Sequence, residues 1–263
     1  MAEARLFIST PTHILTLAGQ DITEEDVLIE HPIEVALNER VIGSAMVMPR
    51  DLEAFAAGFL FGQGYIATPE EIVEVTLCEQ GRVTVYARVD DRQDPETIIT
   101  SGCGGTGRIA RSMLEADFPP AAQTTITFAQ VADLIRGTLG QSTLQQQTHC
   151  VHACGYSAEG RFLGCFEDVG RHNAVDKVIG AILLGRFPTG GAVYTTGRLT
   201  SDMVLKCARI GIPIVLSRTA PSSLGLEIAQ RAGLTLAAYA RPNRLNVFHA
   251  PWRIQQPAIK TPP

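Results

Sequence analysis

One cysteine, Cys103, lies within a run of glycines that gives its sulfur no bulky neighbours. The run ITSGCGGTGR places glycines at positions 102, 104, 105 and 107, and Arg108 follows at once. A structural cysteine usually packs among large apolar side chains, whereas glycines permit positive φ and let another molecule approach closely. A thiolate near a cation is the reactive form of cysteine. The loop therefore favours a reactive thiol; the alternative is a surface turn that happens to contain a cysteine.

Arginines follow several segments that are expected to be strands. Strands at 161–167, 192–196, 212–217 and 234–240 alternate with helices at 173–184, 200–210 and 221–233. This alternation is typical of parallel strands covered by helices, and ligands of such sheets bind beyond the carboxyl ends of the strands. The arginines after the strands are Arg171, Arg198, Arg218, Arg241 and Arg244. Together with helix N-termini near Ser201 and Ser222, they predict a site for a polyanion such as a nucleotide pyrophosphate. The alternative is a set of solvated loop residues.

The densest polar run is EDVGRHNAVDK, from Glu167 to Lys177, where a helix is expected to begin. His172 in this run could act as a general acid or base, or could donate a hydrogen bond to a ligand. The alternative is a helix N-terminus held by local hydrogen bonds.

The segment HCVHAC, from His149 to Cys154, raises the question of a metal. On a strand, Cys150, His152 and Cys154 would point to one face, and Cys165 or Cys103 could complete a zinc site. The chain contains no CxxC, however, and the zinc-deaminase pattern of H-x-E followed by P-C-x-x-C is missing. We therefore expect no bound metal and interpret these thiols as small packing residues.

Length and composition limit the remaining possibilities. The chain has 263 residues and a formal net charge of −5, which argues against general nucleic-acid binding. No apolar run is long enough to span a bilayer, and the N-terminus lacks the features of a secretory signal. We expect a cytoplasmic protein that does not contact membranes and whose six cysteines are reduced.

The organisation expected from the sequence is a smaller α+β portion over residues 1–118, an α/β domain over 119–254 and a flexible tail over 255–263. In the first portion, strands are predicted at 5–9, 14–17, 41–48, 73–77 and 83–89, and 26–38 is expected to form two strands around a kink at His31-Pro32. Helices are predicted at 49–65 and 108–116. The α/β domain should open with a helix at 128–140 capped by Thr127, followed by a loop at 139–148 and a hairpin that turns at 158–160.

Several segments between about Glu30 and Trp252 resemble the formate dehydrogenase accessory sulfurtransferases, the FdhD/NarQ family. They are EHPIEVALN, AAGFLFGQGYI, EDVGRHNAVDKVIG, TTGR, RIGIPIVLSRTAPSSLGLEIA and YARPNRLNVF. The run EDVGRHNAVDK is the most specific of them. The resemblance implies an α/β fold in which the C-terminal domain is a three-layer, cytidine-deaminase-like unit with a mixed sheet and helices on its faces. It also implies a homodimer.

The same resemblance implies a sulfurtransferase that acts as a sulfur carrier. Such proteins receive sulfur as a persulfide from a cysteine desulfurase and pass it to the molybdenum or tungsten bis-guanine-dinucleotide cofactor, before that cofactor enters the formate dehydrogenase catalytic subunit. Cys103 matches the persulfide-bearing cysteine. The common loop of the family is C-G-x-C-G, and Thr106 stands here in place of the second cysteine. Cys150 could supply a second thiol.

The cofactor-contacting segment of the family maps onto Tyr239, Ala240, Arg241, Pro242, Asn243 and Arg244. The segments that contain His172 and Arg198 are expected to contribute. The guanine-dinucleotide cofactor would be a transient acceptor rather than a resident group. A cofactor-binding chaperone that transfers no sulfur is the alternative function; it would need the arginines and not Cys103.

Overall fold

The computed structural model describes residues 5–78, 81–89, 97–99, 108–115 and 117–256. Cys103 and the glycines around it lie outside the described residues. Within the described ranges, no helix combines the length and the apolar character needed to cross a bilayer.

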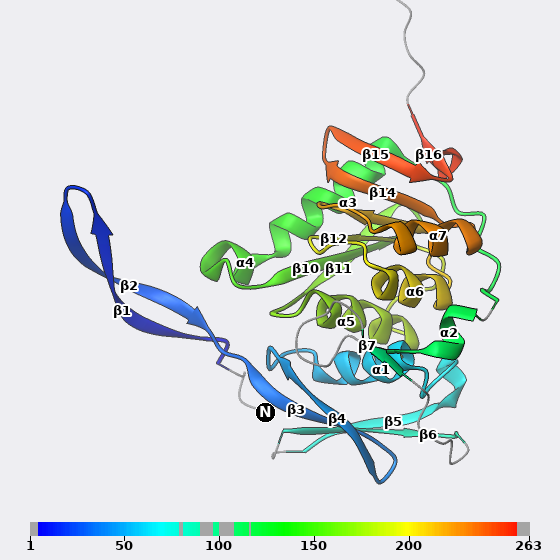
Figure 1. The fold of residues 1–263 in the computed structure, drawn as a ribbon, viewed down its shortest axis with the longest axis horizontal. Helices are drawn as coiled ribbons and strands as arrows, with labels where there is room; N and C mark the ends of the chain where they lie inside the picture. Colours follow the sequence, from blue (N-terminus) through cyan, green and yellow to red (C-terminus); the bar gives the residue numbers. More distant parts are fainter. Residues whose placement is uncertain (1–4, 79–80, 90–96, 100–107, 116, 257–263) are drawn as a thin grey trace, which may run out of the picture.

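A six-stranded mixed sheet forms the centre of the C-terminal half (Figure 1). Its strands are β10 (His152–Ala158), β11 (Arg161–Asp168), β12 (Ala192–Thr195), β13 (Ile214–Ser217), β14 (Thr235–Arg241) and β15 (Arg244–His249). They lie in the order β11-β10-β12-β13-β14-β15, and β12, β13 and β14 are parallel neighbours. Because β10 is antiparallel to both β11 and β12, those two strands point the same way. The strands β11, β12, β13 and β14 therefore share one direction, and β10 runs opposite to them. Their carboxyl ends therefore meet at one edge, as the sequence predicted.

Helices cover both faces of this sheet. On one face, α3 (Phe128–Gln141) packs Val131, Leu134 and Ile135 against side chains such as Tyr194 of β12 and Leu216 of β13. On the other lie α5 (Arg171–Leu183), α6 (Ser201–Arg209) and α7 (Ser223–Arg231). Successive side chains of a strand point to opposite faces, so β12 and β13 contribute buried side chains to the helix layers on both faces of the sheet. The predicted cap of α3 is confirmed: the Thr127 hydroxyl accepts from Gln130 N at 3.2 Å.

The N-terminal layer is a four-stranded sheet in the order β4-β3-β6-β5. It comprises β3 (His31–Leu37), β4 (Arg40–Val47), β5 (Ile72–Leu77) and β6 (Arg82–Ala87), with a 3₁₀ turn at Pro69–Glu71. The helix α1 (Leu52–Gln63) is buried along nearly its whole length, because it lies between this sheet and α5.

Shorter elements correct some of the expected boundaries. The helix expected at 108–116 begins as a strand, β8 (Arg108–Ala110), which pairs with β7 (Thr97–Ile99) and leads into α2 (Arg111–Glu115). The loop expected at 139–148 contains α4 (Thr143–Thr148), whose amides at Leu144 and Gln145 donate to the Glu167 carboxylate. The first residue of the expected tail, Gln255, belongs to β16 (Ile254–Gln255), which follows a 3₁₀ turn at Pro251–Arg253 and pairs with β9 (Ile126–Thr127).

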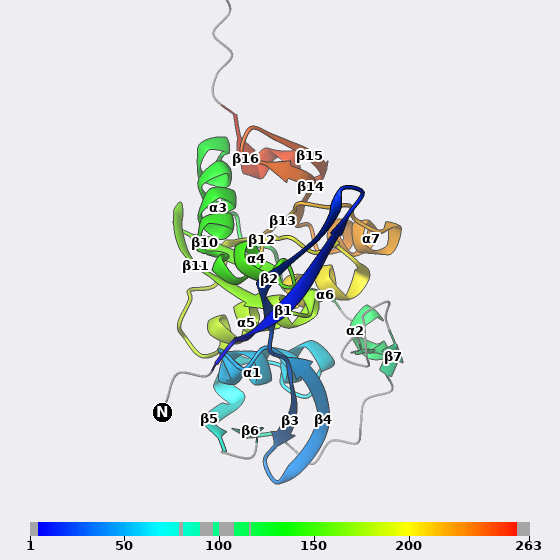
Figure 2. The same cartoon turned by 90° about the vertical axis from the view of Figure 1, so that its left-hand side faces the viewer.

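The first two strands depart most from expectation. The separate strands predicted at 5–9 and 14–17 are one strand, β1 (Phe7–Thr16), paired over ten residues with β2 (Gly19–Leu28). This hairpin, called the arm below, projects from the body beside α4 (Figures 1 and 2). Its root is fixed where Phe7 and Leu28 pack with Met48, Leu144 and Val151.

Two glycines allow α1 and α5 to cross closely. A Cβ on Gly180 of α5 would overlap the Ala54 carbonyl of α1, and a Cβ on Gly58 would overlap the Asp176 carbonyl. Both obstacles are backbone atoms, which cannot turn aside as a side chain can.

Gly180→Ala is therefore expected to destabilise the protein, by about 2–3 kcal/mol or more, because the two helices must separate. Urea unfolding followed by circular dichroism measures this loss. Gly140→Ala is the matched control, since nothing lies within 4 Å of its Cβ position in α3 and alanine is the better helix former. A Gly180→Ala protein as stable as the Gly140→Ala protein would contradict the close crossing.

Candidate functional site

The segment expected to contact a cofactor contains a strained residue, Tyr239. Its φ is 52°, and the register of β14 with β15 shifts between Ala238 and Arg241. A bulky side chain at positive φ costs on the order of 1–3 kcal/mol and often marks a functional position. The Tyr239 amide donates to the Thr219 carbonyl at 3.1 Å, which anchors the bulge to the loop after β13. Tyr239 is 46% exposed, and the centroid of its ring lies 6.4 Å from that of Phe248.

The bulge lines a cavity of about 440 Å³ with Arg241, Arg244 and Asn246. Arg241 Nη1 donates to the carbonyls of Arg218 and Ala240, both at 2.9 Å, so this guanidinium is held in place. Arg244 is exposed. Of the six predicted residues, Tyr239, Arg241 and Arg244 line the cavity, whereas Ala240 is buried in the core beneath α3. Pro242 and Asn243 form the turn between the two strands.

A second cavity, of about 420 Å³, lies at the same edge. Its lining includes Cys150, His152, Thr196, Arg218 and Thr219. His152 Nδ1 lies 3.2 Å from the Thr196 hydroxyl, which also accepts from Ala153 N at 3.0 Å. Burial lowers the pKa of His152, and the nearby charges of Arg171 and His172 lower it further. Both effects disfavour the charged form of this imidazole relative to the neutral one.

The loop after β13 joins the two cavities. The Arg218 carbonyl receives Arg241 at the first cavity, while Arg218 itself lines the second. Arg198 is exposed and follows β12. The helices α6 and α7 also begin at this edge, α7 with the Ser222 hydroxyl accepting from Gly225 N at 3.1 Å. The edge thus presents four exposed guanidinium groups and two helix N-termini, an arrangement suited to phosphates.

His172 and Arg171 occupy a different position from these exposed arginines. His172 is 3% exposed, and its Nε2 lies 2.6 Å from Asp202 Oδ2. The Thr200 hydroxyl also bonds to Asp202, so a buried polar cluster forms where α5 and α6 begin. Arg171 is buried next to Gly197. Neither residue lines either cavity of the edge. A ligand-binding role for His172 stays a prediction, while the local-bond alternative describes the geometry.

The rest of the EDVGRHNAVDK run joins the two halves of the molecule. Lys177 Nζ lies 2.7 Å from Asp168 Oδ2 and donates to the Glu167 carbonyl at 3.1 Å, and both side chains of the pair are fully buried. Asp168 also accepts from Met48 N of the N-terminal layer at 3.2 Å. Directly before Lys177 on α5, Asp176 pairs with Lys206 at 2.7 Å. Burial raises the pKa of Asp176, and Lys206 opposes that rise.

The cysteines divide into buried and exposed groups. Cys154 and Cys207 are packed in the core, where burial raises the pKa of both, that of Cys207 to about 12. Burial also raises the pKa of Cys165 to about 12. Cys78 and Cys150 are exposed free thiols. The interpretation of the HCVHAC thiols as small packing residues holds for Cys154 and is wrong for Cys150, which is exposed and precedes β10, so Cys150, His152 and Cys154 do not share one strand face. In the part of the chain that the structure describes, no three metal-ligating side chains converge.

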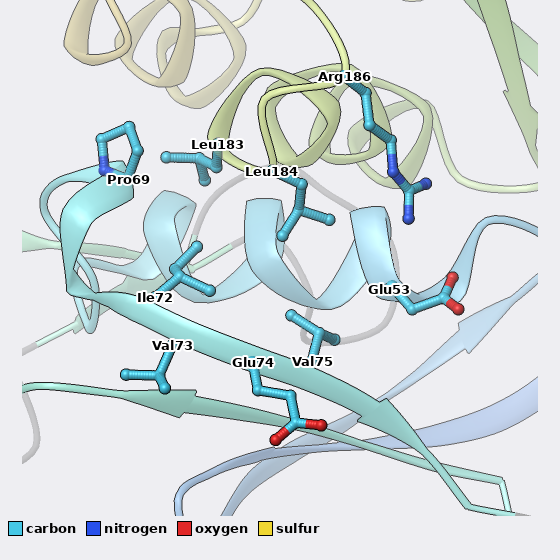
Figure 3. A pocket seen from close by; sticks show the side chains of 9 residues that line it. All are labelled: Glu53, Pro69, Ile72, Val73, Glu74, Val75, Leu183, Leu184 and Arg186. Carbon is cyan, nitrogen blue, oxygen red and sulfur yellow. The ribbon is translucent and has the colours of Figure 1, made fainter.

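A third cavity, of about 460 Å³, lies away from this edge, between α1, β5 and the end of α5 (Figure 3). Its lining combines apolar side chains such as Ile72, Val75 and Leu184 with the charged side chains of Glu53, Glu74 and Arg186. None of the residues expected from the sequence to form a site lines it.

Sequence reasoning missed Asn246, Phe248, Thr196 and Thr219. A signal was available for Asn246, because it lies two residues after Arg244 on a strand and therefore shares its face. Thr219 and Phe248 are brought to Tyr239 by the bulge, which no local pattern indicated.

Proteins of known name resemble this chain in sequence and in structure. The chain is 33% identical over 246 residues to the sulfur carrier protein FdhD of Wolinella succinogenes, covering 90% of this chain and 85% of that protein. It is 32% identical over 238 residues to the protein of the same name from Sulfolobus acidocaldarius, covering 88% of this chain and 92% of that one. A crystal structure described as a formate dehydrogenase accessory protein of Desulfotalea psychrophila matches with a TM-score of 0.86 and 54% identity, covering 95% of this chain and all of that one.

The FdhD/NarQ family itself matches residues 28–255, which include the four-stranded and six-stranded sheets, the arginine edge and the buried EDVGRHNAVDK run. With a match over most of its length, the chain belongs to the FdhD/NarQ family.

Proposed function

We propose that this protein is a sulfur carrier in the maturation of formate dehydrogenase. It receives sulfur on Cys103 as a persulfide from a cysteine desulfurase and passes it to the molybdenum or tungsten bis-guanine-dinucleotide cofactor, which is its substrate. The names of the related proteins support the role of sulfur carrier. The persulfide and the identity of the acceptor are expectations from the family resemblance.

The receiving step needs only a thiolate. The Cys103 thiolate attacks the outer sulfur of the donor's persulfide, the sulfur–sulfur bond of the donor breaks, and the donor cysteine leaves as a thiolate. The product is a persulfide on Cys103, and no oxidant is consumed. The glycines around Cys103 supply the access that a partner protein requires.

The observation that carries the acceptor part of the proposal is the cavity at Tyr239. The exposed Arg244 and the anchored Arg241 border it, and an aromatic ring stands beside them. Guanidinium groups bind pyrophosphate through short, charge-assisted hydrogen bonds, and a half-exposed tyrosine offers a face on which a base can stack. The arrangement fits one guanine nucleotide arm of the proposed cofactor.

Arg244→Ala is expected to weaken the binding of guanosine diphosphate, used as the probe, by roughly tenfold to a hundredfold, because a charge-assisted hydrogen bond is lost. Isothermal titration calorimetry measures the change. Arg136→Ala is the control, since Arg136 is exposed on α3 and pairs with Asp133 away from the edge. Equal affinities of the two variants for guanosine diphosphate would show that Arg244 does not contribute to binding.

The whole proposal is tested by complementation. The wild-type chain should restore formate dehydrogenase activity in a bacterial strain that lacks its own accessory protein, provided that the desulfurase and the enzyme are compatible. The related protein from Wolinella succinogenes, expressed in the same strain, establishes that compatibility. Failure of this chain where the relative succeeds would contradict the proposal. By family resemblance, the functional unit is further proposed to be a cytoplasmic homodimer.

A further inference from the structure

The arm, β1 and β2, is acidic and carries apolar side chains that the body leaves uncovered. Between Phe7 and Leu28 it holds Asp21, Glu24, Glu25 and Asp26 and no lysine or arginine. A two-stranded ribbon alone is at best marginally stable in water. The arm therefore has a composition suited to a basic and partly apolar partner surface.

The register of the arm separates its two faces. Phe7 and Leu28 are directly opposite each other, so they share a face with Asp26, Ile22 and Leu15 farther along. This face turns toward the body at the root, where Phe7 and Leu28 join the cluster with Met48. The Gln147 amide of α4 donates to Asp26 on the same face at 2.6 Å.

Beyond Asp26 the same face loses its cover. Leu15 is 74% exposed and Ile22 67%, and their positions are diagonal neighbours across the two strands. Leu17, in the turn at the tip, is fully exposed. On the opposite face, Ile14 is only 42% exposed. The most exposed apolar side chains thus form a short row in the far half of the arm, on the face that continues from Phe7 and Leu28, and at its tip.

The arm and the arginine edge lie on the same side of the molecule. The edge is next to the start of β10, which directly follows α4, because His152 bonds to Thr196 after β12. The arm leaves the body beside α4 (Figure 1) and crosses in front of the sheet when that side is viewed directly (Figure 2). The edge is basic, and its exposed apolar residues are Tyr239, Val247 and Phe248. Charge and apolar character are therefore complementary between the arm and the edge.

We propose that the arm docks on a second copy of this chain, across the β14–β15 edge that carries Tyr239, Arg241 and Arg244. Each copy gives its arm to the other, as the two-fold symmetry of a closed dimer allows. The arm extends away from the body of its own chain (Figure 1), and the cluster with Met48 and the Asp26–Gln147 bond hold its root in that direction. The arm would border the partner's cavity, so each candidate site would be completed by both chains. This inference rests on the homodimer of the proposed function.

The first test is the mass in solution, by light scattering after size exclusion at a series of low micromolar concentrations. The wild-type chain should be a dimer of two 28.3 kDa subunits. Leu15→Ser with Ile22→Ser should raise the dissociation constant of the dimer at least roughly tenfold, because serine no longer buries an apolar side chain against the partner. Ile14→Ser, on the opposite face of the same strand, should stay within about twofold of wild type. Higher salt should also weaken the dimer, because the contact is partly ionic.

The possible outcomes distinguish the role of the arm from the existence of the homodimer. A wild-type chain that is monomeric at every concentration would overturn both the homodimer and the docking. A dimer that the Leu15/Ile22 variant leaves intact would overturn only the role of the arm. Circular dichroism melting of each variant shows whether the body stays folded, as expected for side chains this exposed.

The second test locates the docking surface. A photoreactive benzoylphenylalanine replaces Leu17, and chains grown on ¹⁴N and ¹⁵N are mixed, allowed to exchange and irradiated. Cross-links that join position 17 of one isotope to a peptide spanning Tyr239–Phe248 of the other are expected. Cross-links confined to one isotope, or mixed-isotope cross-links to another surface, would overturn the proposed location.

Discussion

Cys103→Ala is expected to abolish the restoration of formate dehydrogenase activity, with a loss of roughly a hundredfold or more, as for other covalent nucleophiles. The reason is chemical: alanine cannot attack a persulfide, so sulfur has no route through the protein. Thr106 stands where the family's loop commonly has a second cysteine, and the loop therefore holds no other thiol that could take over. The measurement is enzyme activity in the complemented strain, with the amount of accessory protein confirmed by immunoblot.

Cys78→Ala is the matched control, because Cys78 is an exposed free thiol that lines neither cavity of the arginine edge. It should support wild-type activity. Full activity with Cys103→Ala would instead favour the alternative function, a chaperone that binds the cofactor through the arginine edge and moves no sulfur. Cys150→Ala adds a further comparison, since Cys150 is exposed in the cavity that Arg218 lines. Loss of activity there would show that a second thiol takes part.

The largest effect on stability is expected for Lys177→Met. Methionine preserves most of the volume of the lysine but removes the ammonium group, so Asp168 would remain buried without its counter-ion. Removing one partner of a buried pair costs about 3–5 kcal/mol. Chemical unfolding should show this loss, and Arg136→Met should change stability by less than about 0.5 kcal/mol, because the Arg136–Asp133 pair is exposed. A loss below about 1 kcal/mol for Lys177→Met would contradict a structural role for the pair.

Replacing the whole pair with apolar residues should not restore stability here, although that exchange is neutral in some proteins. Asp168 accepts three further hydrogen bonds, from Met48 N, Gly170 N and the Asn173 amide. An apolar side chain at position 168 would leave the buried Met48 amide without this partner and would remove one bond each from Gly170 N and the Asn173 amide; an unpaired buried donor costs about 1–3 kcal/mol. The double variant should therefore remain clearly less stable than wild type.

The strands and helices of the C-terminal half were predictable because their signals are local. Apolar runs alternate with glycines and helix caps, and four of the five predicted arginines follow strands that share a direction and reach one edge, as the topology implied; Arg171 is buried instead. The helix α4 was not predictable in the same way. Its first amides bond to Glu167, more than twenty residues away, and the sequence around it is rich in polar residues typical of loops.

The same distinction explains the EDVGRHNAVDK run. Its acids and bases look like a ligand site in the sequence, because nothing local shows that Asp168 will meet Met48 or that Asp176 will meet Lys206. Tertiary structure brings these partners together. The buried charged residues then connect the N-terminal layer to the C-terminal sheet instead of forming a ligand site. In the arm, short apolar runs predicted two strands within what is the single strand β1, but such a local signal cannot tell whether a hairpin packs on the body or leaves it.

The central claim, that Cys103 carries sulfur, is tested most directly by intact-mass analysis. The purified protein is incubated with a cysteine desulfurase and cysteine, and the sample is then digested under conditions that preserve persulfides. We expect the mass to increase by one sulfur atom, located on the peptide that contains Cys103 and absent from the Cys103→Ala protein. An unchanged mass, or added sulfur only on other cysteines such as Cys78, would contradict the account.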